Sequence, residues 1–580
     1  MVLKSFAMRK TGDQKHDVEE DSDVVYKDVV IVGNGPGAIC LSYMLAGNWP
    51  YYEGEPHPTD EMLTTRLNYV TPSLRRESEF EKEQIQNGYE MNSRRCCKIT
   101  KKRQGTCLAR SSRSTLATLA FGVEGRGGGK PLALLMDQLQ HPCVDIGLDL
   151  PSLVTWSPGH KIIDHVVLGK GPPGGSWQAM DPAVLTISLS RWMSLPSVGI
   201  KEWCKLMDPE EIQKSVIIPN AVRNGRHRHR AGGEEVSDHT GGSRVPVGTV
   251  AAYYEDYVRF QGLEKYFKCG RTVTSVRPIQ GSRNIEDEYG WIVRGYENDS
   301  GKRFVYKSKR VVLATGTMDS PNRLDLPGEE SRPTWITHDL YELENKLDRL
   351  ARENLSCSMI DESENSTKLE VKPILVVGAG LSAADAIMAA RCRGIPVLHV
   401  FRDGSDDRSR KKSTNHSGTS NYDRLQWLPA SVYPEYHKVY EMMADSGTKY
   451  PLYKALPGYS VVDLGTNGNA TFGPQERRVT LCSPKGQLKN YRVSVVAILI
   501  GSKPDLSYLG EYATRLGKIV NKPIDSKANA IEADDFTYEV TRSPRKGLYA
   551  LGPIVGDNFV RFLLGGAFGI LAHILNTSET

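Results

Sequence analysis

The sequence predicts an α/β fold with two Rossmann-like dinucleotide-binding domains, the second inserted into the first. Two glycine-rich turns carry this prediction, at residues 33–38 and 378–383. Each turn follows an apolar, β-branched run and precedes a helical pattern, which is the strand–turn–helix context of a dinucleotide site. A later run at residues 495–501 repeats the apolar-then-glycine form, so we expect the first domain to resume there.

Each small residue of a turn has its own physical task. The first glycine permits a tight reversal, the second lets the backbone approach a pyrophosphate, and a small third residue lets the helix pack on the strand. The pyrophosphate then rests on unpaired N–H groups at the helix N-terminus, where the helix dipole favours negative charge. These residues are Gly33, Gly35 and Ala38 in the first turn and Gly378, Gly380 and Ala383 in the second. Glycines also occur at ordinary turns, but two such turns in this context predict two sites.

The other elements follow from apolar periodicity and from composition. Residues 250–258 have the spacing of an amphipathic helix, and the apolar run at 310–316 ends the first pass through the first domain. Further strands are expected at residues 162–168, 273–276, 290–294, 303–306 and 397–402. Because residues 1–23 and 71–130 are polar and lack a sustained period, we expect a disordered tail and a long flexible insertion there.

Four parts are therefore expected along the chain. After the tail at 1–23, the first nucleotide domain spans residues 24–332, with the insertion and a loop at about 224–245. The second nucleotide domain spans residues 333–494, and residues 495–580 return to the first domain.

The length, composition and net charge of the chain indicate a globular protein with modest charge. The chain has 580 residues, a net charge of +5 and ten cysteines without CxxC spacing. With no secretory leader, this cysteine usage favours a reducing compartment, and we expect a cytoplasmic protein. The longest apolar stretch, residues 562–575, is shorter than the ~18 to 20 residues of a membrane span, so no transmembrane helix is expected. Neither zinc-ligand spacing nor a nucleic-acid motif is found, so no metal and no nucleic-acid partner is expected.

The motifs and their order resemble the flavin-containing and N-hydroxylating monooxygenases over about residues 24–575. Within that group, residues 33–36, 166–169, 173–177 and 192–196 are similar to the oxidative stress-induced growth inhibitor family. The resemblance implies an FAD- and NADPH-dependent monooxygenase linked to the regulation of cell growth and differentiation. NADPH would reduce FAD, and one atom of molecular oxygen would pass to a nucleophilic substrate, either a small molecule or a protein.

By this resemblance the first turn, including Pro36 and Gly37, holds FAD, and the second turn, with Ser382, holds NADPH. Gly174 and Gly175 let the backbone pass close to the flavin. Trp177 either covers a ring face or is an ordinary packed loop residue.

The returning segment completes the FAD site in this family. Gly316 ends the last strand of the first pass, and Gly556 and Asp557 are expected at the ribityl or phosphate region. A helix beginning near Gly565 would point its N-terminus at the flavin, or would be buried for packing alone.

Two residues are candidates for the ribose ends of the dinucleotides. Arg402 ends the strand about 20 residues beyond the second turn, where an arginine accommodates a 2′-phosphate; the alternative is a solvent-facing side chain. Arg408 and Lys411 are weaker candidates. Glu53 lies at about the same separation from Gly33 and is the candidate for the FAD ribose, although it or Glu55 is equally consistent with an exposed loop charge.

The chain departs from the family pattern before the second domain. Monooxygenases of this class carry F-x-G-x-x-x-H there, but this chain has Arg332, Thr334 and His338 at those places. His338 is therefore the single candidate for a residue that orients NADPH, or else a linker histidine. The departure leaves open a catalytically weak flavoprotein that senses nucleotide and contacts a regulatory protein through the basic insertion. A disulfide reductase is disfavoured by the missing CxxC.

Overall fold

The computed structural model describes residues 24–86, 105–123, 129–207, 244–279, 289–329, 334–360, 371–402, 425, 428, 430–445, 449–465 and 477–577. Several expectations lie outside these residues, namely those for the tail at 1–23, for Arg332, Arg408 and Lys411, and for most of the loop at 224–245. The same holds for residues 87–104 and 124–128 of the expected insertion.

The first domain is built on a seven-stranded sheet around β1 (Val24–Val32). β1 pairs in parallel with β5 (His165–Leu168) on one side and β9 (Arg303–Leu313) on the other. The strand order is β6-β5-β1-β9-β8-β7, and β20 also pairs with β9. The remaining bounds are Phe267–Lys268 (β6), Arg271–Pro278 (β7), Trp291–Glu297 (β8) and Leu548–Ala550 (β20). The expected strands of this domain are confirmed, although the runs at 303–306 and 310–313 form one strand.

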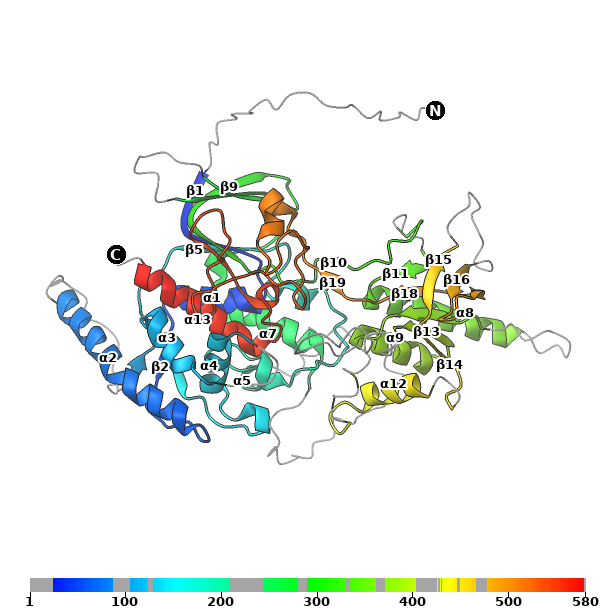
Figure 1. The fold of residues 1–580 in the computed structure, drawn as a ribbon, viewed down its shortest axis with the longest axis horizontal. Helices are drawn as coiled ribbons and strands as arrows, with labels where there is room; N and C mark the ends of the chain where they lie inside the picture. The colour runs from blue at the N-terminus through cyan, green and yellow to red at the C-terminus, as the bar shows by residue number, and fades with distance from the viewer. Residues whose placement is uncertain are drawn as a thin grey trace, which may run out of the picture.

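Helix α1 (Pro36–Leu45) is buried along its whole length because α13 (Val560–Thr577) covers it (Figure 1). α1 begins where β1 ends, and α13 begins shortly after β20 ends. Since β1, β9 and β20 are parallel, both helices start at the same carboxyl edge of the sheet. α7 (Val247–Phe260) also packs on α1 and confirms the expected amphipathic helix.

Gly565 lies inside α13 rather than at its start, so the expected helix beginning near Gly565 is wrong. α13 packs against α4 (Pro131–Gln140), and a Cβ at Gly565 would lie 2.4 Å from the Ala133 Cα. Gly565 is therefore a packing residue that lets two helices approach closely.

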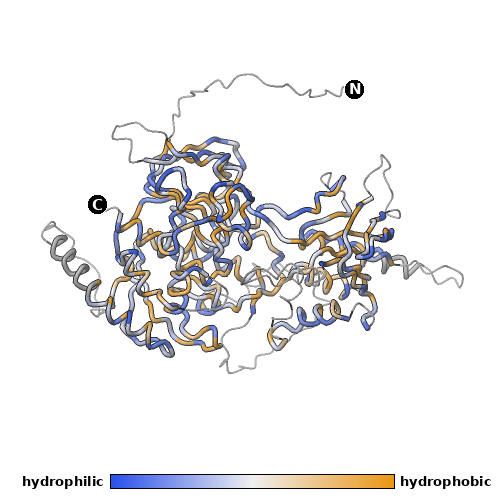
Figure 2. The backbone as a smooth tube through the Cα atoms, viewed as in Figure 1, coloured by the Kyte–Doolittle hydropathy of each residue, from blue (hydrophilic) through white to orange (hydrophobic). Residues whose placement is uncertain are grey.

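α13 is also longer than the apolar stretch expected from the sequence. By length and composition only, it is a helix that could cross a membrane, and 78% of it is buried inside the structure. Most of its residues are buried among the first domain's helices. Figure 2 shows apolar residues gathered in the middle of that domain.

The segment between α1 and β5 carries its own elements. Strand β2 (Trp49–Tyr52) lies between β3 (Thr106–Cys107) and β4 (Val154–Ser157) in a separate antiparallel sheet. α2 (Glu61–Gln86) and α3 (Arg113–Ala120) overlap residues 71–130, so the described part of the expected insertion contains helices. The buried residues of α2 have helical spacing: Leu63, Leu67, Val70 and Leu74.

The second domain has a five-stranded parallel sheet in the order β11-β18-β12-β13-β14. Ile374 and Val376 of β12 pack toward the helices, whereas Leu375 and Val377 pack toward a three-stranded antiparallel sheet. This alternation gives a three-layered domain. Its bounds are Ile336–Thr337 (β11), Val496–Ile498 (β18), Ile374–Val377 (β12), Val397–Phe401 (β13), Tyr453–Pro457 (β14), Leu340–Ile360 (α8), Leu381–Cys392 (α9), Pro434–Ala444 (α12), Ser460–Asp463 (β15), Arg478–Cys482 (β16) and Leu488–Arg492 (β17).

β18 corrects the expected return point of the chain. The run at residues 495–501 was expected to reopen the first domain, but β18 pairs with β11 and β12 of the second. The chain returns only after β18, where β19 (Ser502–Lys503) pairs with β10 (Ser320–Pro321). This antiparallel pair is the place where both linkers cross between the domains.

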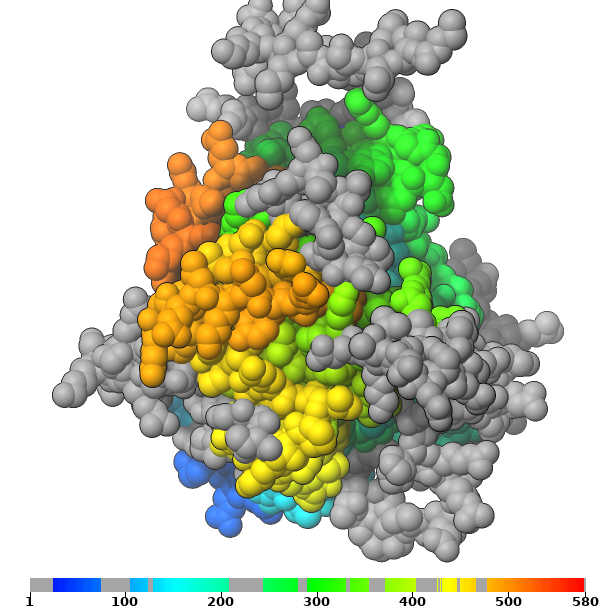
Figure 3. Space-filling model, turned by 90° about the vertical axis from the view of Figure 1, so that its right-hand side faces the viewer, coloured from blue at the N-terminus to red at the C-terminus, as the bar shows by residue number. Residues whose placement is uncertain are grey.

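A second contact joins the two domains through α12. Figure 3 views the molecule from the end at which the second domain lies. Arg244 of the first domain donates to the Glu435 carboxylate and to the Val432 carbonyl. Its guanidinium also lies 4.8 Å from the ring centroid of Tyr433, whose hydroxyl donates to the Ile187 carbonyl at 2.5 Å. The two nucleotide domains are therefore fixed at both the linker crossing and α12.

We expect Gly565→Ala to destabilise the first domain by about 1 to 3 kcal/mol, because its methyl group collides with the Ala133 backbone. Thermal unfolding measures this as a lower midpoint. Gly171→Ala is the control, since its Cβ meets nothing within 4 Å and its backbone is not left-handed. Equal midpoints for the two variants would contradict the close packing of α13 on α4.

Candidate functional site

The first turn has the backbone geometry of a phosphate cradle. Gly33 has φ +103°, and a Cβ there would lie 2.3 Å from the Ala314 carbonyl oxygen, so only glycine fits. A Cβ at Gly35 would meet nothing within 4 Å, which leaves open space above the turn. α1 has Pro36 at its start, no side-chain cap and no acidic residue in its first turn. Its unpaired N–H groups therefore remain available to an anion.

The second turn repeats this geometry in the second domain. Gly378 has φ +131°, and its Cβ would lie 2.3 Å from the Leu499 carbonyl oxygen, while a Cβ at Gly380 would meet nothing within 4 Å. α9 also lacks a side-chain cap and an acidic first turn. Ser382 is exposed in that turn, and Ala383 is buried, as close packing of helix on strand requires.

The loop that carries Gly174 and Gly175 lies against the first turn, and the expected approach of this loop to the flavin stays a prediction. The Gly174 N–H donates to the Asn34 carbonyl at 3.0 Å, and a Cβ at Gly175 would lie 3.0 Å from the Gly35 Cα. Trp177 is half-buried with its ring edge-on to Tyr254, at 5.9 Å between centroids. The loop that carries Gly174, Gly175 and Trp177 therefore packs directly on the glycine turn.

The other two small residues of the first turn serve packing. Ala38 is 1% exposed, and a Cβ at Gly37 would meet the end of the Leu551 side chain. Gly316 follows β9 at the same sheet edge, with φ +68° and open space around it.

A buried histidine on the neighbouring strand hydrogen-bonds the backbone of the second turn. His399 of β13 lies with Nε2 at 2.6 Å from the Gly378 carbonyl and Nδ1 at 2.8 Å from the Tyr453 hydroxyl. Because a carbonyl only accepts, Nε2 carries the proton and Nδ1 accepts from tyrosine. Burial lowers the pKa of His399 to about 4, so the ring is neutral. The sequence reasoning missed this residue, whose signal was a single histidine inside an apolar strand.

Arg402 has the expected position for a ribose contact. It follows β13, the strand beside β12, and its side chain is exposed. Among the described residues, none makes a hydrogen bond or ion pair with its guanidinium, and its expected contact with the 2′-phosphate stays a prediction.

Glu53 does not have the position that was expected for it. It follows β2, which belongs to the separate sheet with β3 and β4, whereas the strand beside β1 is β5. The Glu53 carboxylate accepts from the Thr155 hydroxyl within that separate sheet. The expected 20-residue spacing fails because a long segment lies between α1 and β5.

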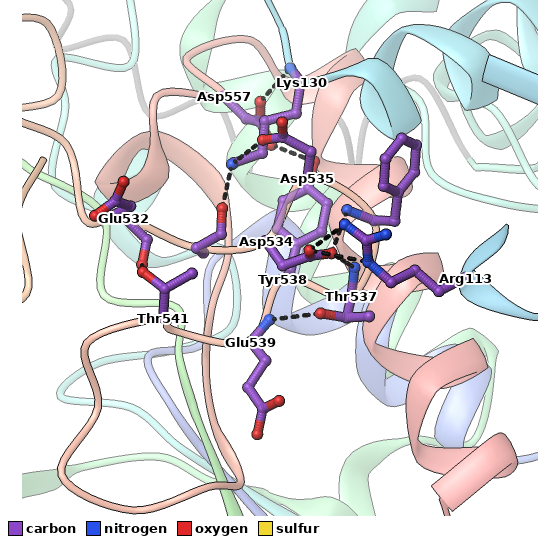
Figure 4. A network of polar contacts seen from close by, with 12 residues as sticks. Arg113, Lys130, Glu532, Asp534, Asp535, Thr537, Tyr538, Glu539, Thr541 and Asp557 are labelled. Carbon is purple, nitrogen blue, oxygen red and sulfur yellow. Dashed lines mark hydrogen bonds and ion pairs between the residues drawn. The ribbon is translucent and has the colours of Figure 1, made fainter. Parts of the chain in front are cut away.

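Asp557 lies in a network of polar contacts with Lys130, Asp535 and Tyr538 (Figure 4). It is 1% exposed, and its carboxylate accepts from the Tyr538 hydroxyl at 2.7 Å and the Lys130 N–H at 3.2 Å. The Lys130 ammonium bonds Asp535 at 2.7 Å, which ties the segment before α4 to the returning chain. Asp557 therefore ties the start of α4 to the returning chain before α13, and its expected contact at the ribityl or phosphate region of FAD stays a prediction. Gly556, with φ +100°, is the turn residue before it.

His338 contacts another residue of the linker region. Its Nε2 lies 2.6 Å from the Glu329 carboxylate, and Glu329 is 1% exposed. Glu329 also accepts from the Leu324 N–H at 3.0 Å. Of its expected companions, Thr334 accepts from the Lys346 ammonium through its backbone carbonyl, at 2.6 Å. This arrangement fits the linker-histidine alternative.

Curated relatives match nearly the whole chain, although no protein-family model matches it. Oxidative stress-induced growth inhibitor 2 of Homo sapiens is 33% identical over 580 residues, 95% of this chain and 93% of the relative. Oxidative stress-induced growth inhibitor 1 of Homo sapiens is 34% identical over 564 residues, 94% of each chain. The Caenorhabditis elegans homolog is 26% identical over 556 residues, 95% of each chain.

Solved structures with a similar chain course are more distant. Bacillithiol disulfide reductase from Bacillus cereus has a TM-score of 0.45 at 13% identity, with 95% of this chain and 99% of that chain covered. Ornithine hydroxylase from Pseudomonas aeruginosa has a TM-score of 0.45 at 11% identity, with 96% and 100% covered.

Asp557→Asn is expected to change the pH dependence of stability. Burial raises the pKa of Asp557 to about 6, so the folded protein keeps a proton that the unfolded chain releases near pH 4. The folded state then binds more protons between about pH 4 and 6, and stability from this group falls as the pH rises.

The difference in unfolding free energy, wild type minus Asp557→Asn, should therefore fall by roughly 3 kcal/mol between pH 4 and 7. Denaturant unfolding of both proteins at several pH values measures it. A difference that is constant with pH, or that rises, would contradict the enclosed carboxyl.

Proposed function

Because the chain belongs to the oxidative stress-induced growth inhibitor family, we propose that it is an FAD-dependent oxidoreductase that uses NADPH and acts as a monooxygenase. The observation that carries the proposal is the repetition of one cradle geometry in the two domains, each time between neighbouring parallel strands of the sheet. In each, a left-handed glycine lies against a neighbouring carbonyl and a second glycine has open space above it. One site then binds FAD and the other NADPH.

The residues at the first turn fit the pyrophosphate of FAD. Gly35 leaves room for it, and the N–H groups of α1 face it without competition from a cap or an acidic side chain. The start of α13 lies at the same sheet edge, so two helix N-termini favour negative charge there. When bound, FAD supplies hydride and oxygen chemistry, and the protein supplies binding and orientation.

The second turn fits NADPH for a similar reason. Gly380 leaves the approach open, Ser382 adds a hydroxyl in the first turn of α9, and Arg402 follows the adjacent strand. The linker crossing and the Arg244 contact hold the two domains so that the nicotinamide can be oriented toward the flavin. The nucleophilic substrate is either a small molecule or a protein.

A second candidate is a nucleotide-sensing regulator of low activity. His338 is the one residue of the F-x-G-x-x-x-H pattern that this chain retains. Its pairing with buried Glu329 holds it in the linker, and this observation favours the second candidate. In this form the protein binds both dinucleotides but contacts a partner in growth control through the basic insertion.

Anaerobic absorption spectroscopy tests the proposal. Purified protein loaded with FAD should lose its flavin absorbance when NADPH is added without oxygen, and should oxygenate a nucleophile when oxygen is returned. Flavin that bleaches but yields no oxygenated product would favour the regulator. Protein that cannot be loaded with FAD would contradict both forms.

Gly35→Asp is expected to abolish FAD binding, because its carboxylate would lie in the open space that the pyrophosphate needs. That same open space lets the variant fold, so its thermal midpoint should match that of the FAD-free wild type. Gly380→Asp is the matched variant at the second turn. It should retain FAD yet fail to bleach with NADPH. A Gly35→Asp protein that keeps its flavin would remove the first turn from the FAD site.

Arg402→Glu should weaken NADPH more than NADH, by tenfold or more, because it replaces an attraction for the 2′-phosphate with a repulsion. Stopped-flow reduction of the flavin over a range of each nicotinamide measures the two affinities. Lys454→Glu, on the next strand β14, controls for charge alone. An unchanged preference in Arg402→Glu would exclude Arg402 from the site.

A further inference from the structure

The first site lacks the acidic residue with which this fold ordinarily binds a ribose. That residue ends the strand beside the turn strand. Here the Gly33 N–H donates to Leu168 of β5 at 2.8 Å, as the Gly378 N–H donates to Val400 of β13 at 3.0 Å. The equivalent next residues are Gly169 and Phe401, so neither strand end carries a carboxylate.

Asn34 fills the place where a side chain at position 169 would begin. A Cβ on Gly169 would lie 2.1 Å from Asn34 Nδ2, 2.2 Å from its Cγ and 2.7 Å from its Oδ1. Asn34 is 4% exposed. The polar group at the end of β5 is therefore supplied from the glycine turn itself.

The orientation of the Asn34 amide is fixed by chemistry. Nδ2 donates to the Gly171 carbonyl at 2.7 Å and to the Pro172 carbonyl at 2.9 Å. Carbonyls only accept, so the two ends of the amide cannot be exchanged. Among the described residues, no group donates a hydrogen bond to Oδ1. This oxygen is also not one of the fully buried polar atoms that lack a hydrogen-bond partner in that part of the chain.

A groove of about 360 Å³ lies beyond Cys269, which is one of its lining residues. The Cys269 Sγ lies 3.9 Å from Asn34 Nδ2, so the groove is separated from the amide by this side chain. The groove runs from residues 267–271 at the end of β6 to residues 297–300 at the β8–β9 turn. Its volume is at the lower end of the range for ligand pockets.

We propose that Asn34 Oδ1 replaces the missing carboxylate and accepts a hydrogen bond from the adenosine 2′-hydroxyl of the dinucleotide at the first turn. The proposal rests on the proposed function of that turn as the FAD site. Asn34 is thus a specificity residue that recognises the ribose with a neutral acceptor. Such a bond is weaker than one to a charged carboxylate.

The test compares FAD with FAD that carries 2′-deoxyadenosine, using dissociation constants from flavin fluorescence. The wild type should bind the deoxy form about three- to tenfold more weakly, as expected for one neutral hydrogen bond. Asn34→Ala should bind both forms equally. The double variant Asn34→Gly with Gly169→Glu should regain discrimination, and to a greater extent, because it restores a carboxylate in the vacated place.

Gln178→Ala is the control for loop packing. Gln178 Nε2 donates to the Pro173 carbonyl at 2.6 Å and so ties down the same loop without reaching the ribose. It should keep the wild-type ratio between the two ligands even if both bind more weakly. The ratio is internal to each folded protein, so a general loss of stability does not imitate the result.

Three results would overturn the inference. A wild type that binds FAD and its deoxy form equally would exclude Asn34 as a ribose contact while leaving the FAD site intact, as would an Asn34→Ala protein that keeps the wild-type ratio. A wild type that binds neither form would overturn the proposed function as well.

Discussion

Both candidate sites depend on one close contact between backbones. In each domain the first glycine of the turn lies against the carbonyl of the residue that follows the neighbouring strand, Ala314 beside Gly33 and Leu499 beside Gly378. A Cβ on either glycine would come within 2.3 Å of that oxygen, so a larger residue would push the helix away from the sheet. Because the helix starts immediately after this contact, its free N–H groups are aimed at the carboxyl edge.

The first domain builds outward from this contact. α1 is entirely buried between the sheet and α13, and α13 is held by α4 through Gly565 and by the Asp557, Tyr538 and Lys130 contacts. α4 belongs to the long segment between α1 and β5. That segment is therefore part of the support of the site rather than an appendage. It also separates β5 from the turn in sequence, so the residues at the end of β5 cannot be located by counting from Gly33.

The features that the sequence predicted are those set by neighbours in the chain. The glycine turns, the strands before them and the helices after them follow from local steric and periodic rules. Glu53 failed because the spacing rule assumes a direct path from helix to strand. The helix start expected near Gly565 was wrong because packing against α4, which is distant in sequence, decides the role of this residue. β18 was misplaced because an apolar run does not state which sheet it joins. Asn34 and His399 hydrogen-bond partners far away in sequence, so their contacts cannot be located from the residues beside them.

If the two turns are separate sites for two different dinucleotides, the protein binds both at once. Calorimetric titration of NADP⁺ into protein already saturated with FAD tests this most directly, since the oxidised nicotinamide binds without reacting. We expect one NADP⁺ per chain with the FAD retained. NADP⁺ that displaces FAD, or that binds only to FAD-free protein, would instead show that the two dinucleotides share one site.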